Sequence, residues 1–261
     1  MNIRMDPSVG SAYKSRSQKA RVITEDWVEE ELYCPSCPSQ SLESLPASTR
    51  VADFRCPECF ERFQAKSSSK PIYDKVLDSA YETMMIAIKT DSAPNLVLIH
   101  YSPIEWTVEN LVLIPRFFVV PSAIEKRKPL SPTARRAGWV GCNILLHHIP
   151  DSGRINAVKD RVAREPTLVK DQWKRTVFAK DIVPESRGWT IEVLRFVESL
   201  HRDRFTLEEM YQFEGDLSEL HPQNRNIKAK IRQQLQVLRD KGILRFDTPG
   251  VYEILKRFPR F

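Results

Sequence analysis

The stretch VADFRCPECFERFQAK, residues 51–66, carries the features that decide the fold of this chain. A short apolar run ends in Asp53, a Cys-Pro-Glu-Cys turn follows, and the stretch closes on Gln64-Ala-Lys66. Short β-prone runs on both sides of a polar turn are typical of two neighbouring strands. We therefore expect residues 50–54 and 62–66 to pair, with a cysteine-bearing turn between them.

A second cysteine pair lies upstream of this turn. Cys34-x-x-Cys37 and Cys56-x-x-Cys59 are separated by 18 residues, a spacing typical of a Cys₄ zinc site. A two-residue gap lets a tight turn aim two thiolates at one ion, and two such turns complete a tetrahedron. The alternatives are a reactive dithiol or two disulfides, but the paired spacing favours zinc. With four protein ligands, the zinc would be structural rather than catalytic.

Length and composition exclude several classes of protein. The chain has 261 residues, of which 41% are hydrophobic, which is enough for a core and excludes a disordered chain. The sequence contains no run of 18 apolar residues, so it predicts no membrane span. The first residues lack the apolar stretch of a secretory signal. We expect a cytoplasmic protein, and nothing in the sequence calls for an obligate protein partner. The net charge of +6 fits a polyanionic partner.

Residues 1–182 mix helical and strand-like patterns, which predicts an α/β domain. Helices are expected where apolar residues recur at helical spacing, and strands where apolar runs are short. A basic, proline-bearing loop over 126–139 precedes the last of these runs. The expected helices are 17–32 and 78–88, and the further expected strands are 95–101, 110–121 and 142–149.

The pattern becomes helical after a stretch at 181–188, which we interpret as a linker. Thr206 followed by Glu209 forms the pattern of a capping box at a helix start. Three helices followed by a β-hairpin is the order of a winged helix, a variant of the helix-turn-helix. The chain is therefore expected to divide into domains 1–182 and 183–261. The expected elements of the second domain are helices at 188–200, 205–217 and 224–242 and a hairpin at 243–255.

Asp53, Gln64 and Lys66 form the candidate catalytic set. Mg²⁺ prefers oxygen ligands, and the Asp53 carboxylate, the Gln64 side-chain carbonyl and the backbone carbonyl of Ala65 can supply them. Because side chains alternate along a strand, Gln64 and Lys66 point to the same side. Lys66 can then orient or deprotonate an attacking water and stabilise charge on a phosphate.

The same spacing also occurs by chance, so a solvated, charged hairpin is the alternative interpretation. Gln64 provides one carboxylate fewer than an acid at that position, which should weaken metal binding. Glu25 or Asp26 in the first helix could approach the site, although exposed helix charges are their ordinary interpretation. The fifth cysteine, Cys142, is expected to be a buried core thiol.

Segments spread over nearly the whole chain resemble the DpnI-like, methyladenine-dependent restriction endonucleases, a family of PD-(D/E)XK nucleases. Asp53 and Lys66 match the family's aspartate and the lysine of its Glu-x-Lys, whereas Gln64 replaces the glutamate. The cysteine pairs match as well. The segments that carry the resemblance are SQKARVITEDWV (17–28), VADF (51–54), KPLSPTARRAGWVGCNI (128–144), SRGWTIEVL (186–194), FTLEEMYQFEGDL (205–217) and IKAKIRQQLQVLRDKGI (227–243).

The resemblance implies a catalytic domain with a mixed sheet flanked by helices and an embedded zinc site, followed by a winged helix. It implies a type II, site-specific deoxyribonuclease of a bacterial restriction-modification system. Such an enzyme uses Mg²⁺ to hydrolyse both strands of double-stranded DNA at GATC sites that carry N6-methyladenine. The other interpretation is a zinc-stabilised winged-helix reader or regulator of methylated DNA without nuclease activity. The set Asp53, Gln64 and Lys66 discriminates between the two.

Trp139 matches the methyl-sensing tryptophan of the family that the chain resembles. An aromatic face close to a methyladenine gains apolar contact worth about 0.8 kcal/mol per buried methyl-sized group. Arg135 and Arg136 beside it can contact guanine or phosphate, and Gly138 leaves room for close approach of the backbone to DNA. The alternative is a core tryptophan packed beside the strand at 142–149.

The long C-terminal helix carries a second set of candidate DNA contacts. In a winged helix the N-terminal half of this helix meets base edges in the major groove. Arg225, Lys228 and Arg232 lie on a basic stripe beside the apolar stripe. A solvated basic face is the alternative interpretation. Arg245 and Lys256, near the wing, are expected to touch backbone phosphates.

Overall fold

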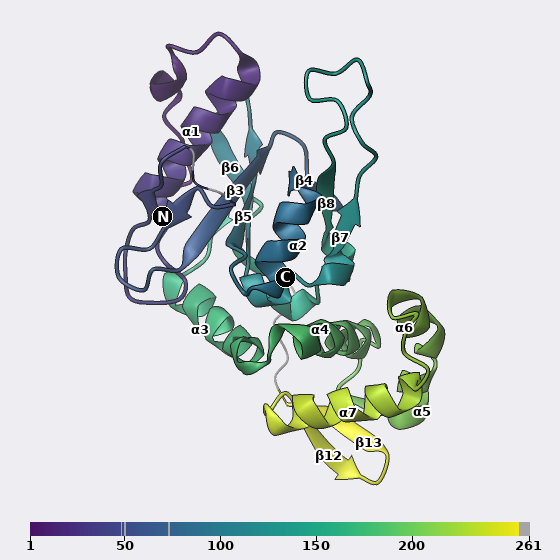
Figure 1. The fold of residues 1–261 in the computed structure, drawn as a ribbon. Helices are drawn as coiled ribbons and strands as arrows, with labels where there is room; N and C mark the ends of the chain where they lie inside the picture. Colours follow the sequence, from purple (N-terminus) through teal and green to yellow (C-terminus); the bar gives the residue numbers. More distant parts are fainter. Residues whose placement is uncertain (48, 50, 73, 256–261) are drawn as a thin grey trace.

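The computed structural model describes residues 1–47, 49, 51–72 and 74–255. The N-terminal part is α/β, and the C-terminal part consists of helices followed by a hairpin (Figure 1). Among the described residues, none of the helices combines the length and apolar character that a membrane span requires. Arg50 of the expected strand at 50–54 and Lys256 near the expected wing lie outside the described residues.

A mixed sheet, seven-stranded over the described residues, forms the centre of the N-terminal part. Within it β3 and β5 run parallel, and the other neighbouring pairs are antiparallel. This confirms the α/β expectation for the first domain. In spatial order the strands are β1 (Glu43–Ser44), β2 (Phe54–Arg55), β3 (Arg62–Ser68), β5 (Asn95–Ser102), β6 (Thr107–Ile114), β9 (Ile155–Lys159) and β10 (Val162–Ala163).

Both faces of this sheet are buried. Along β5, Val97 and Ile99 pack into one core cluster, while Leu96 and Leu98 pack into the other. Strands covered on both faces are continuous apolar runs in sequence, as the run at 95–101 is. One face is covered by α1 (Arg16–Glu31) and α3 (Pro166–Thr176), and the other by α2 (Tyr81–Lys89) and a small antiparallel sheet of β4 (Lys75–Ala80), β8 (Gly141–Leu145) and β7 (Ile124–Lys126) (Figure 1).

Four expected elements of this part differ from the structure. In the strand expected at 50–54, Phe54 is the one described residue that lies in a strand, because β2 spans Phe54–Arg55. Residues 78–80, expected as the start of a helix, end β4, because pairing of this segment with β8 overrides its helical spacing. The expected strand at 110–121 ends at Ile114, because Pro115 cannot donate to the ladder. The strand expected at 142–149 ends at Leu145. Short 3-10 helices complete this part: η1 (Pro7–Gly10), η2 (Arg116–Phe118), η3 (Pro121–Ala123), η4 (Leu146–His148), η5 (Asp151–Gly153) and η6 (Val177–Asp181).

The C-terminal part has the element order of a winged helix. The capping box is present, since the Glu209 N–H donates to Thr206 Oγ1 at 3.2 Å and the Thr206 N–H donates to Glu209 Oε2 at 2.8 Å. The helix expected at 205–217 begins only at Leu207, because Phe205 pairs with Tyr252 in a strand, and a turn at Gln212 and Phe213 splits it into two helices. The elements are α4 (Pro184–Ser199), β11 (Arg204–Thr206), α5 (Leu207–Tyr211), α6 (Glu214–Leu220), α7 (Ile227–Asp240), β12 (Leu244–Thr248) and β13 (Val251–Ile254).

The helix α4 joins both parts of the chain in one core. The stretch 181–188, expected as a linker, is mostly helical, because α4 begins at Pro184. One cluster of buried residues includes Phe117 and Phe118 from the N-terminal part together with Ile191 and Leu235 from the winged helix. Figure 1 shows α4 between the sheet-containing part and α7. The winged helix is therefore packed against the first part rather than tethered to it.

Arg187 fixes the start of α4 at this junction. Its buried guanidinium donates to the backbone carbonyls of Ala179 at 2.9 Å and Ile182 at 2.7 Å, and to Asp91 Oδ1 at 2.5 Å. Arg116 Nη1 lies 2.9 Å from the same carboxylate oxygen. Burial opposes ionisation of Asp91, but the two guanidinium groups outweigh it and hold the pKa of Asp91 below its usual range.

Glu198, near the end of α4, makes a second polar contact across the junction. Its Oε2 accepts a hydrogen bond of 3.2 Å from the backbone N–H of Ser152 in η5. Burial raises the pKa of Glu198 from 4.5 to about 7. Because the folded state favours the protonated carboxyl, this group removes stability from the folded chain as the pH rises from about 4.5 to 7.

The replacement Glu198→Gln should therefore stabilise the protein at pH 8 and leave its stability nearly unchanged at pH 5. We expect a gain of about 1–3 kcal/mol at pH 8, because the amide keeps the hydrogen bond without a buried charge. Thermal unfolding at the two pH values measures the effect. Glu43→Gln, at an exposed carboxylate, is the control that should change neither value. An equal effect of Glu198→Gln at both pH values would contradict the assignment.

Candidate active site, metal centre and DNA interface

The four cysteines converge at the end of α1 and in the turn between β2 and β3. Cys34 Sγ lies 3.6 Å from Cys59 Sγ, and Cys37 Sγ lies 3.5 Å from Cys56 Sγ. The four sulfur atoms all lie within 4.8 Å of one another. These separations are too long for disulfide bonds, in which the sulfurs are about 2.0 Å apart.

This arrangement fits a tetrahedral zinc ion. Zinc–sulfur bonds of about 2.3 Å place thiolates about 3.8 Å apart, which is close to both measured pairs. Burial raises the pKa of the Cys34 thiol. Burial also opposes ionisation of Cys56, but the backbone N–H groups of Cys59 and Glu58 outweigh it and lower the pKa of Cys56 to about 7. The Cys₄ cluster can therefore hold zinc, as the cysteine spacing predicts.

The Cys₄ cluster anchors the hairpin that carries the candidate catalytic residues. Cys34 and Cys56 are fully buried and belong to the same core cluster as Phe54 of β2 and Phe63 of β3. Strand β2 pairs with β3 over only two residues, so the hairpin has few backbone hydrogen bonds of its own. A metal at the turn would thus hold the strands together at one end.

Asp53 directly precedes β2, at the point where the pairing of β2 with β3 ends. It lies beside the edge of the part of β3 after Phe63, which β2 does not pair with. Its backbone N–H donates to the Phe63 carbonyl at 2.9 Å, and its Oδ2 accepts from the backbone N–H of Ala65 at 2.9 Å. The N–H and C=O of a strand residue point to the same side, so the Ala65 carbonyl also faces this edge. Burial raises the pKa of Asp53, while the Ala65 N–H and Lys66 oppose that rise.

Gln64 and Lys66 point to one face of β3, as side-chain alternation predicts. On the opposite face, Phe63 packs into the cluster under α1, and Ser67 Oγ lies 3.1 Å from Thr24 Oγ1 of that helix. Gln64 is only 6% exposed, and its Oε1 has no hydrogen-bond partner among the described residues. The structure brings Asp53, Gln64, Ala65 and Lys66 together, and their chemical roles stay predictions.

Asp78 is a site residue that the sequence analysis missed. Its Oδ1 lies 2.6 Å from Lys66 Nζ, and its side chain is fully buried. The residue was assigned to a helix, whereas it lies in β4, in the small sheet that covers this face. Burial alternates along β4, since Val76 and Asp78 are buried while Lys75 and Leu77 are exposed, but the sequence Lys-Val-Leu-Asp does not alternate in polarity and therefore offers no signal for this strand.

Of Glu25 and Asp26, the two acids of α1 considered for the site, only Glu25 is influenced by a candidate catalytic residue. Burial raises the pKa of Glu25, Arg21 at 3.7 Å opposes the rise, and the charge of Asp53 adds to it. Burial also raises the pKa of Asp26, and the neighbouring charges that add to this rise are those of Asp6 and Glu29 rather than that of Asp53.

Trp139, Arg135 and Arg136 lie in the loop that joins β7 to β8 and extends away from the rest of the molecule (Figure 1). Trp139 is half-buried and belongs to neither core cluster, so the core interpretation is wrong. Its ring lies against Gly141, where an added Cβ would come within 2.7 Å of the ring, and the guanidinium of Arg136 lies 4.8 Å from the ring centre. Gly138 has a φ of +77°, which favours glycine.

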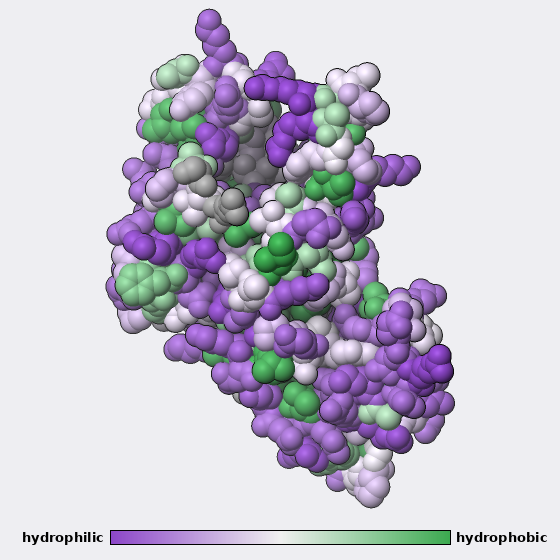
Figure 2. Space-filling view, viewed as in Figure 1, coloured by the Kyte–Doolittle hydropathy of each residue, from purple (hydrophilic) through white to green (hydrophobic). Residues whose placement is uncertain are grey.

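On α7 the apolar stripe is buried as expected, through Ile227, Ile231, Leu235 and Leu238. Lys228 and Arg232 beside this stripe are exposed. Arg225 is exposed too, but it precedes α7, because the helix begins at Ile227 rather than at residue 224 as expected. Lys228 Nζ lies 3.5 Å from Glu214 of α6. Hydrophilic residues cover much of the visible face of the winged helix (Figure 2).

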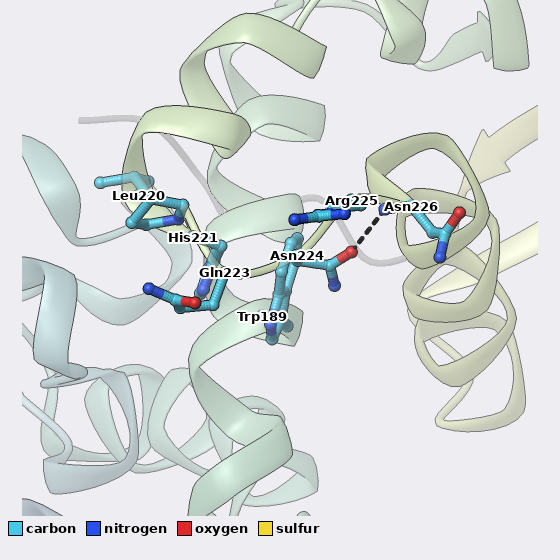
Figure 3. A pocket seen from close by; sticks show the side chains of 8 residues that line it. Trp189, Leu220, His221, Gln223, Asn224, Arg225 and Asn226 are labelled. Carbon is cyan, nitrogen blue, oxygen red and sulfur yellow. Dashed lines mark hydrogen bonds between the residues drawn. The ribbon is translucent and has the colours of Figure 1, made fainter.

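An open hollow lies beside the N-terminus of α7 and was not anticipated from the sequence (Figure 3). Trp189 of α4 stacks on His221 with ring centres 3.6 Å apart, and His221 Nε2 hydrogen-bonds to the buried Glu192. The backbone N–H of Asn226 donates to Asn224 Oδ1 at 2.8 Å. The hollow borders the end of α7 that meets base edges in winged helices. Its lining residues are Trp189, Leu220, His221, Pro222, Gln223, Asn224, Arg225 and Asn226.

Comparison with protein families gives two matches that together cover most of the chain. Residues 1–182 match the family described as DpnI: Dam-replacing family. Residues 185–254 match the family described as DpnI_C: Dam-replacing HTH domain. The second match agrees with the winged-helix order of α4 to β13.

Removal of zinc should destabilise the N-terminal part strongly. We expect Cys34→Ser to lose the bound zinc ion and to lower the unfolding temperature by more than about 10 °C, because metal binding is coupled to folding. Zinc content by elemental analysis and thermal unfolding measure the two effects. Cys142→Ser is the matched control: this thiol is buried in the other core cluster, so its zinc content should equal that of the wild type. Full zinc content in Cys34→Ser would rule out the Cys₄ site.

Proposed function

The chain belongs to the DpnI, or Dam-replacing, family, and from this premise we propose that it is a type II, methylation-dependent restriction endonuclease. Its target is double-stranded DNA with N6-methyladenine in GATC, and it hydrolyses both strands with Mg²⁺. The observation that carries the nuclease activity is the hydrogen bond between Asp53 Oδ2 and the Ala65 N–H, which puts a carboxylate beside Gln64 and Lys66.

The proposed magnesium site consists of Asp53, the Gln64 side-chain carbonyl and the backbone carbonyl of Ala65. The unpartnered, buried Oε1 of Gln64 supports this assignment, because a buried oxygen without a hydrogen bond is stabilised by a cation. When bound, Mg²⁺ polarises the phosphoryl oxygen and favours ionisation of the attacking water. The zinc assigned to Cys34, Cys37, Cys56 and Cys59 has a structural role.

Lys66 acts on the phosphate and the water. Its ammonium group donates hydrogen bonds and stabilises the charge that develops on the phosphoryl oxygens. A water oxygen forms the new bond to phosphorus as the bond to the 3′ oxygen breaks, and the 3′ oxygen takes up a proton. The products are a 5′-phosphate and a 3′-hydroxyl.

Two separate elements would recognise the DNA. In the loop between β7 and β8, Trp139 offers its face to the adenine methyl groups, while Arg135 and Arg136 contact guanine or phosphate. Arg225, just before α7, and Lys228 and Arg232 on α7 contact the major groove and the backbone. We place the enzyme in the cytoplasm of a bacterium that leaves the adenines of GATC unmethylated, and it acts without an obligate protein partner.

A reader of methylated DNA without nuclease activity is the second candidate function. The observation that favours it is Gln64, which leaves the proposed magnesium site with a single carboxylate among Asp53, Gln64 and Ala65. An amide binds a divalent cation more weakly than a carboxylate does.

Incubation with two plasmids that differ only in adenine methylation at GATC tests the activity. With Mg²⁺, we expect fragmentation of the methylated plasmid alone. Asp53→Ala and Lys66→Ala should each lower the cleavage rate by more than about a thousandfold and leave binding in place, while Glu43→Ala on exposed β1 should cleave as the wild type does. Binding of methylated DNA without cleavage would instead support the reader, and cleavage that survives Asp53→Ala would refute the assigned site.

The replacement Trp139→Ala should reduce the preference for methylated over unmethylated DNA. The expected loss is about tenfold, because two methyl-sized contacts of about 0.8 kcal/mol each are lost. Titration of both DNAs against each variant measures the ratio of the two affinities. Lys128→Ala, an exposed charge in the same loop, is the control that should weaken binding of both DNAs equally. An unchanged ratio in Trp139→Ala would show that the tryptophan does not sense the methyl groups.

A further inference from the structure

The proposed magnesium site is short of negative charge. Position 64 holds a glutamine, whose side-chain oxygen carries only a partial charge. The affinity of an oxygen site for a divalent cation rises with the number of charged ligands. A working site of this composition would need a further carboxylate from elsewhere in the fold.

Asp78 is placed to supply it. The strand β4 lies in the small sheet that covers the Gln64 and Lys66 face of β3, and Asp78 points inward from it. Its side chain is fully buried, and its Oδ1 lies 2.6 Å from Lys66 Nζ. The two residues therefore link β4 to the strand that carries the candidate catalytic set.

The surroundings of Asp78 leave its charge undercompensated. Among the described residues, its Oδ2 has no hydrogen-bond partner and no ion pair. Gln64 Oε1, on the same face of β3 as Lys66, is also buried without a partner. A buried carboxylate is costly unless several donors or a cation satisfy it. Two buried oxygens without hydrogen bonds, both on residues near Lys66, would be stabilised by a bound cation.

The charges at this place also influence one another. Burial, the Ala65 hydrogen bond and Lys66 have the largest effects on the pKa of Asp53. The charge of Asp78 comes next, and it raises that pKa. Repulsion between two carboxylates is relieved when a divalent cation binds between them.

We propose that Asp78 is a ligand of the catalytic metal and supplies the carboxylate that position 64 lacks. The inference rests on the proposed nuclease function for the position of the metal site. One oxygen of Asp78 holds Lys66, and the other binds the cation together with Asp53 and Gln64.

Binding of Mn²⁺ to the zinc-loaded full-length protein, without DNA, tests the proposal through the EPR signal of free Mn²⁺. Asp78→Asn should weaken Mn²⁺ binding by at least about tenfold. Gln64→Glu should retain or raise the affinity, and the double variant Gln64→Glu/Asp78→Asn should regain most of what Asp78→Asn loses. Recovery by a carboxylate at position 64 is the specific result, because a merely structural role of Asp78 predicts none.

Asp74→Asn, an exposed acid just before β4, is the matched control and should bind Mn²⁺ as the wild type does. If Asp78→Asn does not fold because the charge of Lys66 is left unpaired, Lys66→Met/Asp78→Asn removes both charges and should show the same weak binding. Wild-type affinity in either Asp78 variant, no recovery in the double variant, or no Mn²⁺ binding by the wild type would each overturn the proposal.

The same variants separate this proposal from the proposed function. If the wild type cuts methylated DNA while Asp78→Asn binds Mn²⁺ normally, the nuclease assignment stands and the role of Asp78 fails. If Mn²⁺ binding depends on Asp78 but no DNA is cut, the metal site stands and the nuclease assignment fails.

Discussion

The convergence of four cysteine sulfurs on one point is the constraint on which the N-terminal part depends. The β2–β3 hairpin has a two-residue ladder, and a segment of that size does not hold its geometry in water by backbone hydrogen bonds alone. The Cys₄ cluster ties its turn to the end of α1 and to the core that contains Trp27. Asp53 directly precedes β2 and Lys66 lies in β3, both only a few residues from the cysteines. The positions of these two side chains therefore depend on the same anchor.

The second constraint is the polar gap between β3 and β4. Two sheets that pack face to face normally fill their interface with apolar side chains. Here the polar residues Gln64, Lys66 and Asp78 lie beside apolar residues of the same interface, and among the described residues Gln64 Oε1 and Asp78 Oδ2 have neither a hydrogen bond nor an ion pair. Buried polar groups are costly when they are left unsatisfied, so the fold gives up stability at the place where a cation and a phosphate would bind.

The shared core under α4 has a consequence for DNA binding. The loop with Trp139 extends from the N-terminal part, and the exposed basic residues of α7 belong to the winged helix. Arg187 and the apolar cluster at η2 pack the winged helix against the first part. These two elements, which we propose to contact DNA, belong to one packed body and keep a defined spacing. An ordered junction therefore favours a defined distance between the DNA sequences that they would contact.

Local patterns in the sequence determined the cysteine cluster, the shared face of Gln64 and Lys66, the buried stripe of α7 and the capping box at Thr206. Each depends on residues a few positions apart, where the spacing of a turn, strand or helix dictates the geometry. Only the tertiary structure decided that residues 78–80 form a strand, that Asp78 meets Lys66, that Glu25 rather than Asp26 approaches Asp53, and that Trp139 lies outside the core. These outcomes depend on pairing and packing between distant segments, such as Asp78 with Cys142 in β8, which the helical spacing at 78–88 obscured.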